Sequence, residues 1–174
     1  MTKYDRVPTN KEIFFGEEEI IVSKTDPRGR ITYANDVFVR VSGYSEHELI
    51  DAPHSILRHP DMPRCVFWLL WETIGKGNEI FAYVKNMAKS GDFYWVFAHV
   101  TPSFDPQGQI IGYHSSRRTP DRKAVESAAG LYSQLLAIEN KYEDRKQGMQ
   151  AGIDTVLKLL GDKGISYDEL VFSL

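Results

Sequence analysis

The sequence has few of the residues that would cross-link a chain, bind a structural metal or anchor it in a membrane. Cys65 is the single cysteine among 174 residues, which excludes an internal disulfide and a cysteine-rich zinc site and is compatible with a reducing compartment. No apolar run approaches the roughly 20 residues of a membrane-spanning helix. The charged N-terminus is not followed by the apolar segment of a signal peptide. These absences predict a cytoplasmic protein without direct membrane insertion.

An excess of positive charge is also missing. The net charge is −3 and the isoelectric point is near 6.0, so the chain has no electrostatic footprint for nucleic acid. Its short basic cluster, at Arg117, Arg118, Arg122 and Lys123, lacks interleaved aromatic residues. We interpret this cluster as the solvated exit of a strand and expect no nucleic-acid partner.

Catalytic motifs are absent from the sequence as well. There is no glycine-rich phosphate loop, no nucleophile with a base at a recognisable spacing, and no cluster of metal ligands, and the five histidines are scattered. The sequence therefore predicts a protein that is not an enzyme. Aromatic residues, in contrast, make up 12% of the chain, which fits a sheet with large side chains or a pocket for a flat ligand.

The order of apolar runs and turn residues predicts an α+β fold. Proline- and glycine-rich turns separate extended runs, and Ser45 with Glu48 forms a capping-box pattern. The run 93–104 is apolar on both faces, which predicts a central strand. We expect a five-stranded antiparallel sheet with short helices on one face. The strands are expected at 20–23, 31–34, 79–88, 93–104 and 109–118, and the helices begin after Asn35, Ser45 and Pro63.

Both ends of the chain are expected to lie outside this domain. Residues 1–19 are predicted to form an N-terminal arm, residues 20–118 the domain, and residues 119–174 a helical extension. Helical spacing of apolar residues predicts a long helix over 122–146, interrupted at Gly148, and then a shorter one ending at Gly161. The apolar stripe of the long helix could pair with a second copy of the chain or pack on the sheet of its own domain.

The stretch 54–63 concentrates two imidazoles, a guanidinium and a carboxylate between prolines, directly before the apolar run 66–71. Residue chemistry alone leaves two interpretations open. One is a capped turn between helices, and the other is the polar edge of a pocket.

Several segments carry a resemblance to a known family. Residues 20–118 resemble PAS domains, and more narrowly the PAS sensors of the aerotaxis-receptor type, including the stand-alone CetB-like PAS proteins of energy taxis. The Arg-His-Pro-Asp-Met-Pro segment is the specific part, because generic PAS domains lack it. The matching segments are 31–36, 38–45, 53–54, 58–63, 84–86, 91–96 and 112–113.

The resemblance implies a noncovalently bound FAD whose redox state is relayed to a membrane-bound chemoreceptor-type partner. We also expect the protein to be a homodimer. It also implies which residues contact the cofactor: Arg58, His59, Asp61, Asn86, Trp71 and Asn35. Arg58 offers a planar fork of donors to phosphate oxygens, and Asn86 offers a donor and an acceptor to a ring amide. The chain departs from the family at Ile80 and Phe81, where a tryptophan contact is expected.

Each of these assignments has a structural alternative. Arg58 and Asp61 could form a salt bridge, and Asn86 could be satisfied by backbone groups. Trp68 and Trp71 could be core residues, with only one of them facing the pocket. At the level of function, a haem sensor that uses His99 or His114, a ligand-free dimerisation and docking module, and a flavoenzyme remain as alternatives. Cys65 is not placed like a flavin-adduct cysteine, so no photochemical adduct is expected.

Overall fold

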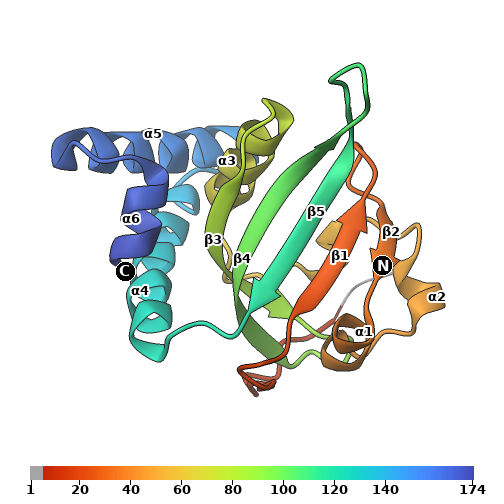
Figure 1. Cartoon of the computed structure of the whole chain (residues 1–174). Coiled ribbons are helices and arrows are strands. Elements are labelled where there is room, and N and C mark those ends of the chain that lie inside the picture. The colour runs from red at the N-terminus through yellow and green to blue at the C-terminus, as the bar shows by residue number, and fades with distance from the viewer. Residues whose placement is uncertain (1–5) are drawn as a thin grey trace.

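The computed structural model of the chain describes residues 6–174, and these form one antiparallel sheet with helices around it. The strands follow one another across the sheet in the order β2-β1-β5-β4-β3 (Figure 1). Their bounds are β1 Ile21–Thr25, β2 Ile31–Ala34, β3 Ile80–Met87, β4 Phe93–Phe104 and β5 Ile110–Arg118. The helices are α1 Asp36–Ser42, α2 Glu46–Leu49, the 3-10 helix η1 His54–Leu57, α3 Arg64–Gly75, α4 Arg122–Glu139, α5 Arg145–Lys163 and α6 Tyr167–Ser173. The predicted α+β fold with five antiparallel strands is confirmed.

Local signals in the sequence set the ends of the short helices. Ser45 and Glu48 form the capping box of α2 in both directions. Helix α1 ends at Gly43, whose φ of 71° is accessible to glycine without a steric penalty. In the turn between β1 and β2, Asp26 Oδ1 accepts hydrogen bonds from the amides of Arg28 and Arg30 at 2.9 and 2.8 Å. These local bonds fix the ends of α1 and α2 and the shape of the β1–β2 turn.

The sheet separates two packing layers. Because side chains alternate across a strand, Ala98 and Val100 of β4 face α3, whereas Trp95 faces the C-terminal helices. The Trp95 ring lies 6.3 Å from that of Tyr132 on α4. Antiparallel sheets commonly leave one face to solvent. Here helices α4 and α6 cover the outer face near β3 and β4 (Figure 1). The stripe of α4 packs on the sheet of its own domain, as one of the two alternatives predicted.

The expected interruption of the long helix at Gly148 is wrong. The helix breaks earlier, over residues 140–144, and Gly148 lies inside α5. Asp144 starts the new helix, since its side chain accepts from the amides of Lys146 and Gln147. Gly148 is required by packing instead, because a Cβ there would lie 2.3 Å from the carbonyl oxygen of Glu139.

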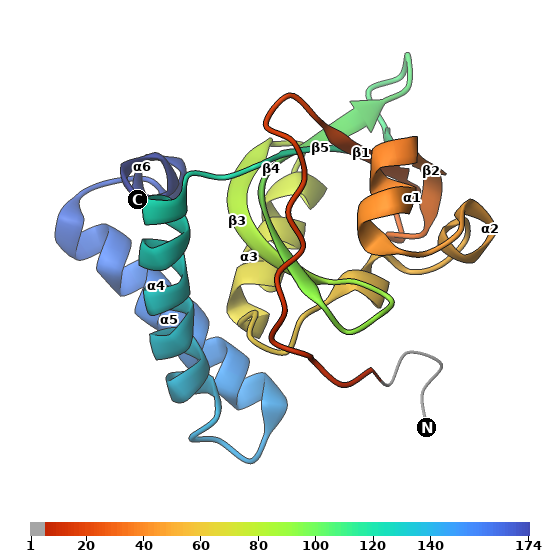
Figure 2. The same ribbon diagram turned by 90° about the horizontal axis from the view of Figure 1, so that it is seen from below.

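The N-terminal arm is part of the folded structure from residue 6. It runs beside β4 (Figure 2), where Ile13 donates to the carbonyl of Phe93 at 2.7 Å and Phe93 donates to the carbonyl of Lys11 at 2.9 Å. Farther along, Thr119 donates to the carbonyl of Phe15 at 3.3 Å, at the point where β5 leads into α4. The arm thus joins the sheet to the start of the C-terminal helices.

Strand β3 is an edge strand of the sheet, yet side chains donate to carbonyl groups along its outward edge and just beyond its end. Tyr132 donates to the carbonyl of Tyr83 at 2.7 Å. Arg6 donates to the carbonyls of Met87 and Ala88 at 2.8 and 2.7 Å. None of the helices within residues 6–174 is both long and apolar enough to cross a membrane.

Candidate functional site

A cavity of about 520 Å³ lies between the inner face of the sheet and the η1–α3 segment. Its middle is walled by the aliphatic side chains of Val84, Ala98 and Val100. The two ends of the cavity differ in exposure, and we call them the buried end and the open end. The buried end is lined by Ser23, His54, Asn86 and Arg117, and the open end by Arg28, Arg58, Arg64, Trp68, Trp71 and Met149.

Arg117 of β5 places a guanidinium at the buried end. The residue is 2% exposed, and its Nη2 donates to Ser23 Oγ at 2.5 Å. Its Nε and Nη1 have no hydrogen-bond partner among residues 6–174. Burial lowers the pKa of Arg117 to about 10, so the side chain is still charged at neutral pH. A buried cation without a counter-charge is destabilising, and an electron-rich ligand in the cavity would compensate it.

The interpretation of Arg117 as part of a solvated strand exit is therefore wrong. Tyr113, Ser115 and Arg117 alternate along β5, and all three line the cavity. The two-residue period was visible in the sequence and could have placed Arg117 on the inner face. Its neighbour Arg118 is exposed, as the alternation requires.

His54, the first histidine of the stretch 54–63, also lines the cavity. Its Nε2 lies 3.2 Å from Ser23 Oγ, the same hydroxyl that accepts from Arg117. Desolvation, and secondarily the charge of Arg117, lowers the pKa of His54 to about 3. The imidazole is therefore neutral at pH 7, and a hydroxyl that accepts from Arg117 can donate to it.

Arg58 and Asn86 come together across the edge of the sheet. The two residues form an isolated antiparallel bridge between the η1–α3 connection and β3, and both side chains line the cavity. The guanidinium of Arg58 lies 4.5 Å from the centre of the Phe67 ring, which orients it by a cation–π contact. Burial lowers the pKa of Arg58.

His59 and Asp61 do not line the cavity. His59 is 1% exposed and accepts from the amide of Asp61 at 3.1 Å through Nδ1, while its buried Nε2 has no partner among residues 6–174. Burial first, and the charge of Lys85 second, lowers its pKa to about 4. The Asp61 side chain is 60% exposed and pairs with Lys85 at 2.6 Å. Asp61 therefore forms its salt bridge with Lys85 and not with Arg58, which was the structural alternative.

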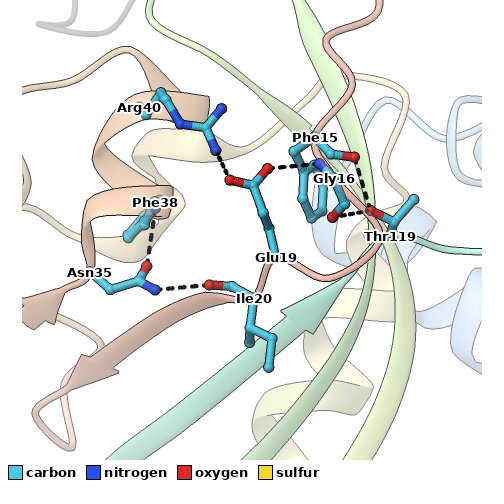
Figure 3. Close-up of polar contacts among 8 residues, drawn as sticks. All are labelled: Phe15, Gly16, Glu19, Ile20, Asn35, Phe38, Arg40 and Thr119. Atoms are coloured by element: carbon cyan, nitrogen blue, oxygen red, sulfur yellow. Dashed lines mark hydrogen bonds and ion pairs between the residues drawn. The ribbon is translucent and has the colours of Figure 1, made fainter.

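Asn35 has a structural position away from the cavity. Its Oδ1 accepts from the amides of Phe38 and Val22, both at 3.0 Å, and its Nδ2 donates to the carbonyl of Ile20 at 2.8 Å. Figure 3 shows how the amide links the start of α1 to the residue before β1. The predicted cap is present, and a contact of Asn35 with a cofactor stays a prediction.

Both candidate tryptophans of α3 lie at the open end, so the expectation that only one faces the pocket is wrong. Trp68 and Trp71 are 36% and 39% exposed. The Trp71 ring packs edge-on against Tyr113 at 5.6 Å and lies against the β1–β2 turn. A Cβ on Gly29 in that turn would be 2.8 Å from Trp71 Cη2. Trp71 therefore bridges α3 and the turn over the cavity.

The remaining histidine and cysteine candidates lie elsewhere. His99 and His114 occupy the strand positions next to Val100 and Tyr113, so they face away from the cavity. No group of three or more metal-ligating side chains occurs within residues 6–174. Cys65 is buried, and burial raises its pKa to about 12, which keeps the thiol protonated at neutral pH.

The profile of the PAS fold matches residues 31–117, which is half of the chain. The aerotaxis receptor of Escherichia coli (strain K12) is 40% identical over 129 residues, which cover 74% of this chain and 25% of the receptor. The nitrogen fixation regulatory protein of Klebsiella pneumoniae is 31% identical over 102 residues, which cover 59% of this chain and 21% of that protein. This chain thus spans about a quarter or less of these relatives.

Solved structures agree on the fold. The light-state structure of the blue-light photoreceptor Aureochrome1 LOV superposes with a TM-score of 0.58, at 20% identity, over 63% of this chain and 88% of that chain. The residues that match the PAS profile run along the chain from β2 to most of β5 and include η1 and α3. These elements form most of the cavity. The chain belongs to the PAS fold family, and its PAS domain is of the aerotaxis-receptor type.

Proposed function

We propose that the protein is a redox sensor that binds FAD noncovalently in the cavity and relays its redox state to a membrane-bound chemoreceptor-type signalling protein. The observation that carries this proposal is Arg117, a buried cation at the end of an apolar-walled cavity with two nitrogen atoms free to donate. The similarity to an aerotaxis receptor supports the sensing role. A light-oxygen-voltage domain of similar structure, with a TM-score of 0.56, is described with a flavin analogue, which supports the cofactor class.

The residues that line the cavity fit a flavin. A volume of about 520 Å³ lies within the range of roughly 300–1,000 Å³ that small-molecule sites occupy. The aliphatic middle suits the faces of a flat ring, and the buried end offers donors and an amide to ring carbonyls and nitrogens. The open end carries three arginines, Arg28, Arg58 and Arg64, which suit a diphosphate.

Each residue has a proposed role in this arrangement. Arg117 and Asn86 hydrogen-bond the polar edge of the ring, Arg58 binds phosphate oxygens, and Trp71 covers the ring from the open end. His59, Asp61 and Asn35 act by positioning, because their side chains are engaged outside the cavity. A bound flavin supplies reversible electron and proton uptake. That uptake would change the charge and the hydrogen-bonding groups on the ring edge that faces Arg117 and Asn86.

The visible spectrum of the purified protein tests the cofactor. We expect absorption bands of an oxidised flavin, and release of FAD rather than FMN on denaturation. If the protein purifies without colour, it should take up FAD on reconstitution. A colourless protein that takes up no FAD would contradict the proposal and favour a ligand-free docking module. A sharp Soret band would favour a haem sensor.

The signalling and assembly parts need separate measurements. A sensor should show no turnover of pyridine nucleotides, whereas steady NADH oxidation would indicate a flavoenzyme. Sedimentation of the FAD-loaded chain should give about twice the monomer mass of 19.9 kDa if it is a homodimer. Co-sedimentation with the cytoplasmic part of a chemoreceptor should depend on whether the cofactor is oxidised or reduced.

A further inference from the structure

The C-terminal helices contact the cavity wall through one buried carboxylate. Glu139, the last residue of α4, is 0% exposed. Its Oε1 accepts from the amide of Cys65 at 2.8 Å and its Oε2 from the amide of Arg64 at 3.0 Å. These are first-turn amides of α3, whose own N-cap residue, Pro63, makes no side-chain bond. Glu139 therefore caps α3 from a distant part of the chain, and we call this contact the Glu139 cap.

The Glu139 cap also holds a residue of the cavity. Arg64 Nε lies 3.1 Å from Glu139 Oε2, and the Arg64 side chain lines the open end. Met149 of α5 lines the same end. Two residues of the cavity wall thus take their positions from the docking of the C-terminal helices on α3.

The contact between α5 and α3 tolerates no added atom. A Cβ on Gly152 would lie 2.9 Å from the Sγ of Cys65 and 3.1 Å from Oε1 of Glu139. A Cβ on Gly161, on the same helix, would meet nothing within 4 Å. The close approach at Gly152 means that a small shift of α3 has to be followed by α5, because packed interfaces are not continuously deformable.

We infer that the Glu139 cap couples the occupancy of the cavity to the docking of α4 and α5 on α3. A ligand that contacts Arg64 and Met149 binds more tightly when the helices are docked, and by reciprocity it stabilises their docking. The signal then leaves the cavity through α3 and the cap rather than through the sheet. The inference rests on the proposed function only for the identity of the ligand, FAD.

Cys65 provides a single-site probe of this docking, because it is the single cysteine and its thiol is covered by Gly152 and Glu139. We expect an aromatic disulfide reagent to label Cys65 slowly in the intact protein. Gly152→Ala should speed labelling about tenfold and weaken FAD binding about fivefold or more, within the usual range of coupling energies. Gly161→Ala is the matched control and should change neither by more than about twofold.

The reciprocal measurement uses the unaltered chain. Saturating FAD should slow the labelling of Cys65 and the hydrogen exchange of α4 and α5 amides several-fold, and Glu139→Gln should abolish that protection. Binding of FAD without any change in labelling or exchange would overturn the inference while leaving the proposed cofactor in place. If the protein takes up no FAD, the proposed function fails and the coupling is judged on the unloaded protein. Faster exchange of first-turn α3 amides in Gly152→Ala then supports it, and unchanged exchange overturns it.

Discussion

At the buried end of the cavity one guanidinium is almost wholly removed from water, whereas at the open end Arg28 is exposed and the Arg64 side chain is 21% exposed. Arg117 keeps two nitrogens without partners within residues 6–174, while Arg64 is paired with Glu139. Desolvation makes the charge of Arg117 strong toward a ligand and costly without one, whereas solvent makes the charge of the exposed Arg28 weak in both respects. Affinity and stability should therefore respond differently to changes at the two ends.

The largest effect is expected at Arg117. Arg117→Met removes the donors that the ligand would use, and the loss of about 3 kcal/mol in charge-assisted hydrogen bonds lowers FAD affinity about 100-fold or more. The unliganded protein should instead become more stable, by about 1–4 kcal/mol, because an apolar side chain replaces a desolvated charge. Flavin fluorescence titration and urea unfolding measure the two effects. Arg118→Met, one residue along on the exposed face, is the control, and a variant Arg117→Met with unchanged affinity would remove the contrast between the ends.

Acid should have the next largest effect, because burial keeps both His54, at the buried end, and His59, outside the cavity, as neutral rings. The folded-state pKa values of His54 and His59 are about 3 and about 4, below the ordinary value of 6.5, so the unfolded chain binds protons first as pH falls. The stability these neutral rings provide is complete above pH 6.5 and declines between pH 6.5 and the folded values. Between pH 7 and 4.5 each ring should cost about 2–3 kcal/mol of unfolding free energy. Urea unfolding at a series of pH values checks this, and His59→Asn should flatten the profile.

A smaller effect is expected at Arg58, which is half-buried and stacked on Phe67. Arg58→Ala should weaken FAD binding about tenfold, the worth of one charge-assisted bond. Asp61→Asn should weaken it less than about threefold, because that carboxylate is exposed and pairs with Lys85 at the surface. Equal effects of the two substitutions would mean that the stretch 54–63 acts as a single unit.

The smallest effect is expected at Arg28. Arg28→Ala should lower FAD affinity about twofold at low salt, and the difference should vanish near ~0.5 M salt because exposed charges are screened. Titrations at two salt concentrations measure it. A large, salt-independent loss would show that the open end is as desolvated as the buried end.

Much of the fold could be predicted because its signals are local. The capping box at Ser45 and Glu48 and the end of α1 at Gly43 depend on neighbouring residues alone. The register of the last strand could also have been read, and it would have placed Arg117 in the cavity. The Glu139 cap could not, because nothing near Glu139 in sequence indicates that its carboxylate replaces the missing cap of a helix 75 residues earlier.

The side chains along β3 have a consequence for how the PAS domain can be handled in isolation. Tyr132 and Arg6 cap carbonyls on the outer edge of that strand, and both lie outside residues 20–118. A fragment trimmed to the PAS domain would expose a hydrogen-bonding edge of the kind that pairs with other chains. Poor solubility of such a fragment would reflect an uncovered strand edge and sheet face rather than an unfolded domain, and the arm and α4 can be regarded as the domain's built-in protection against aggregation.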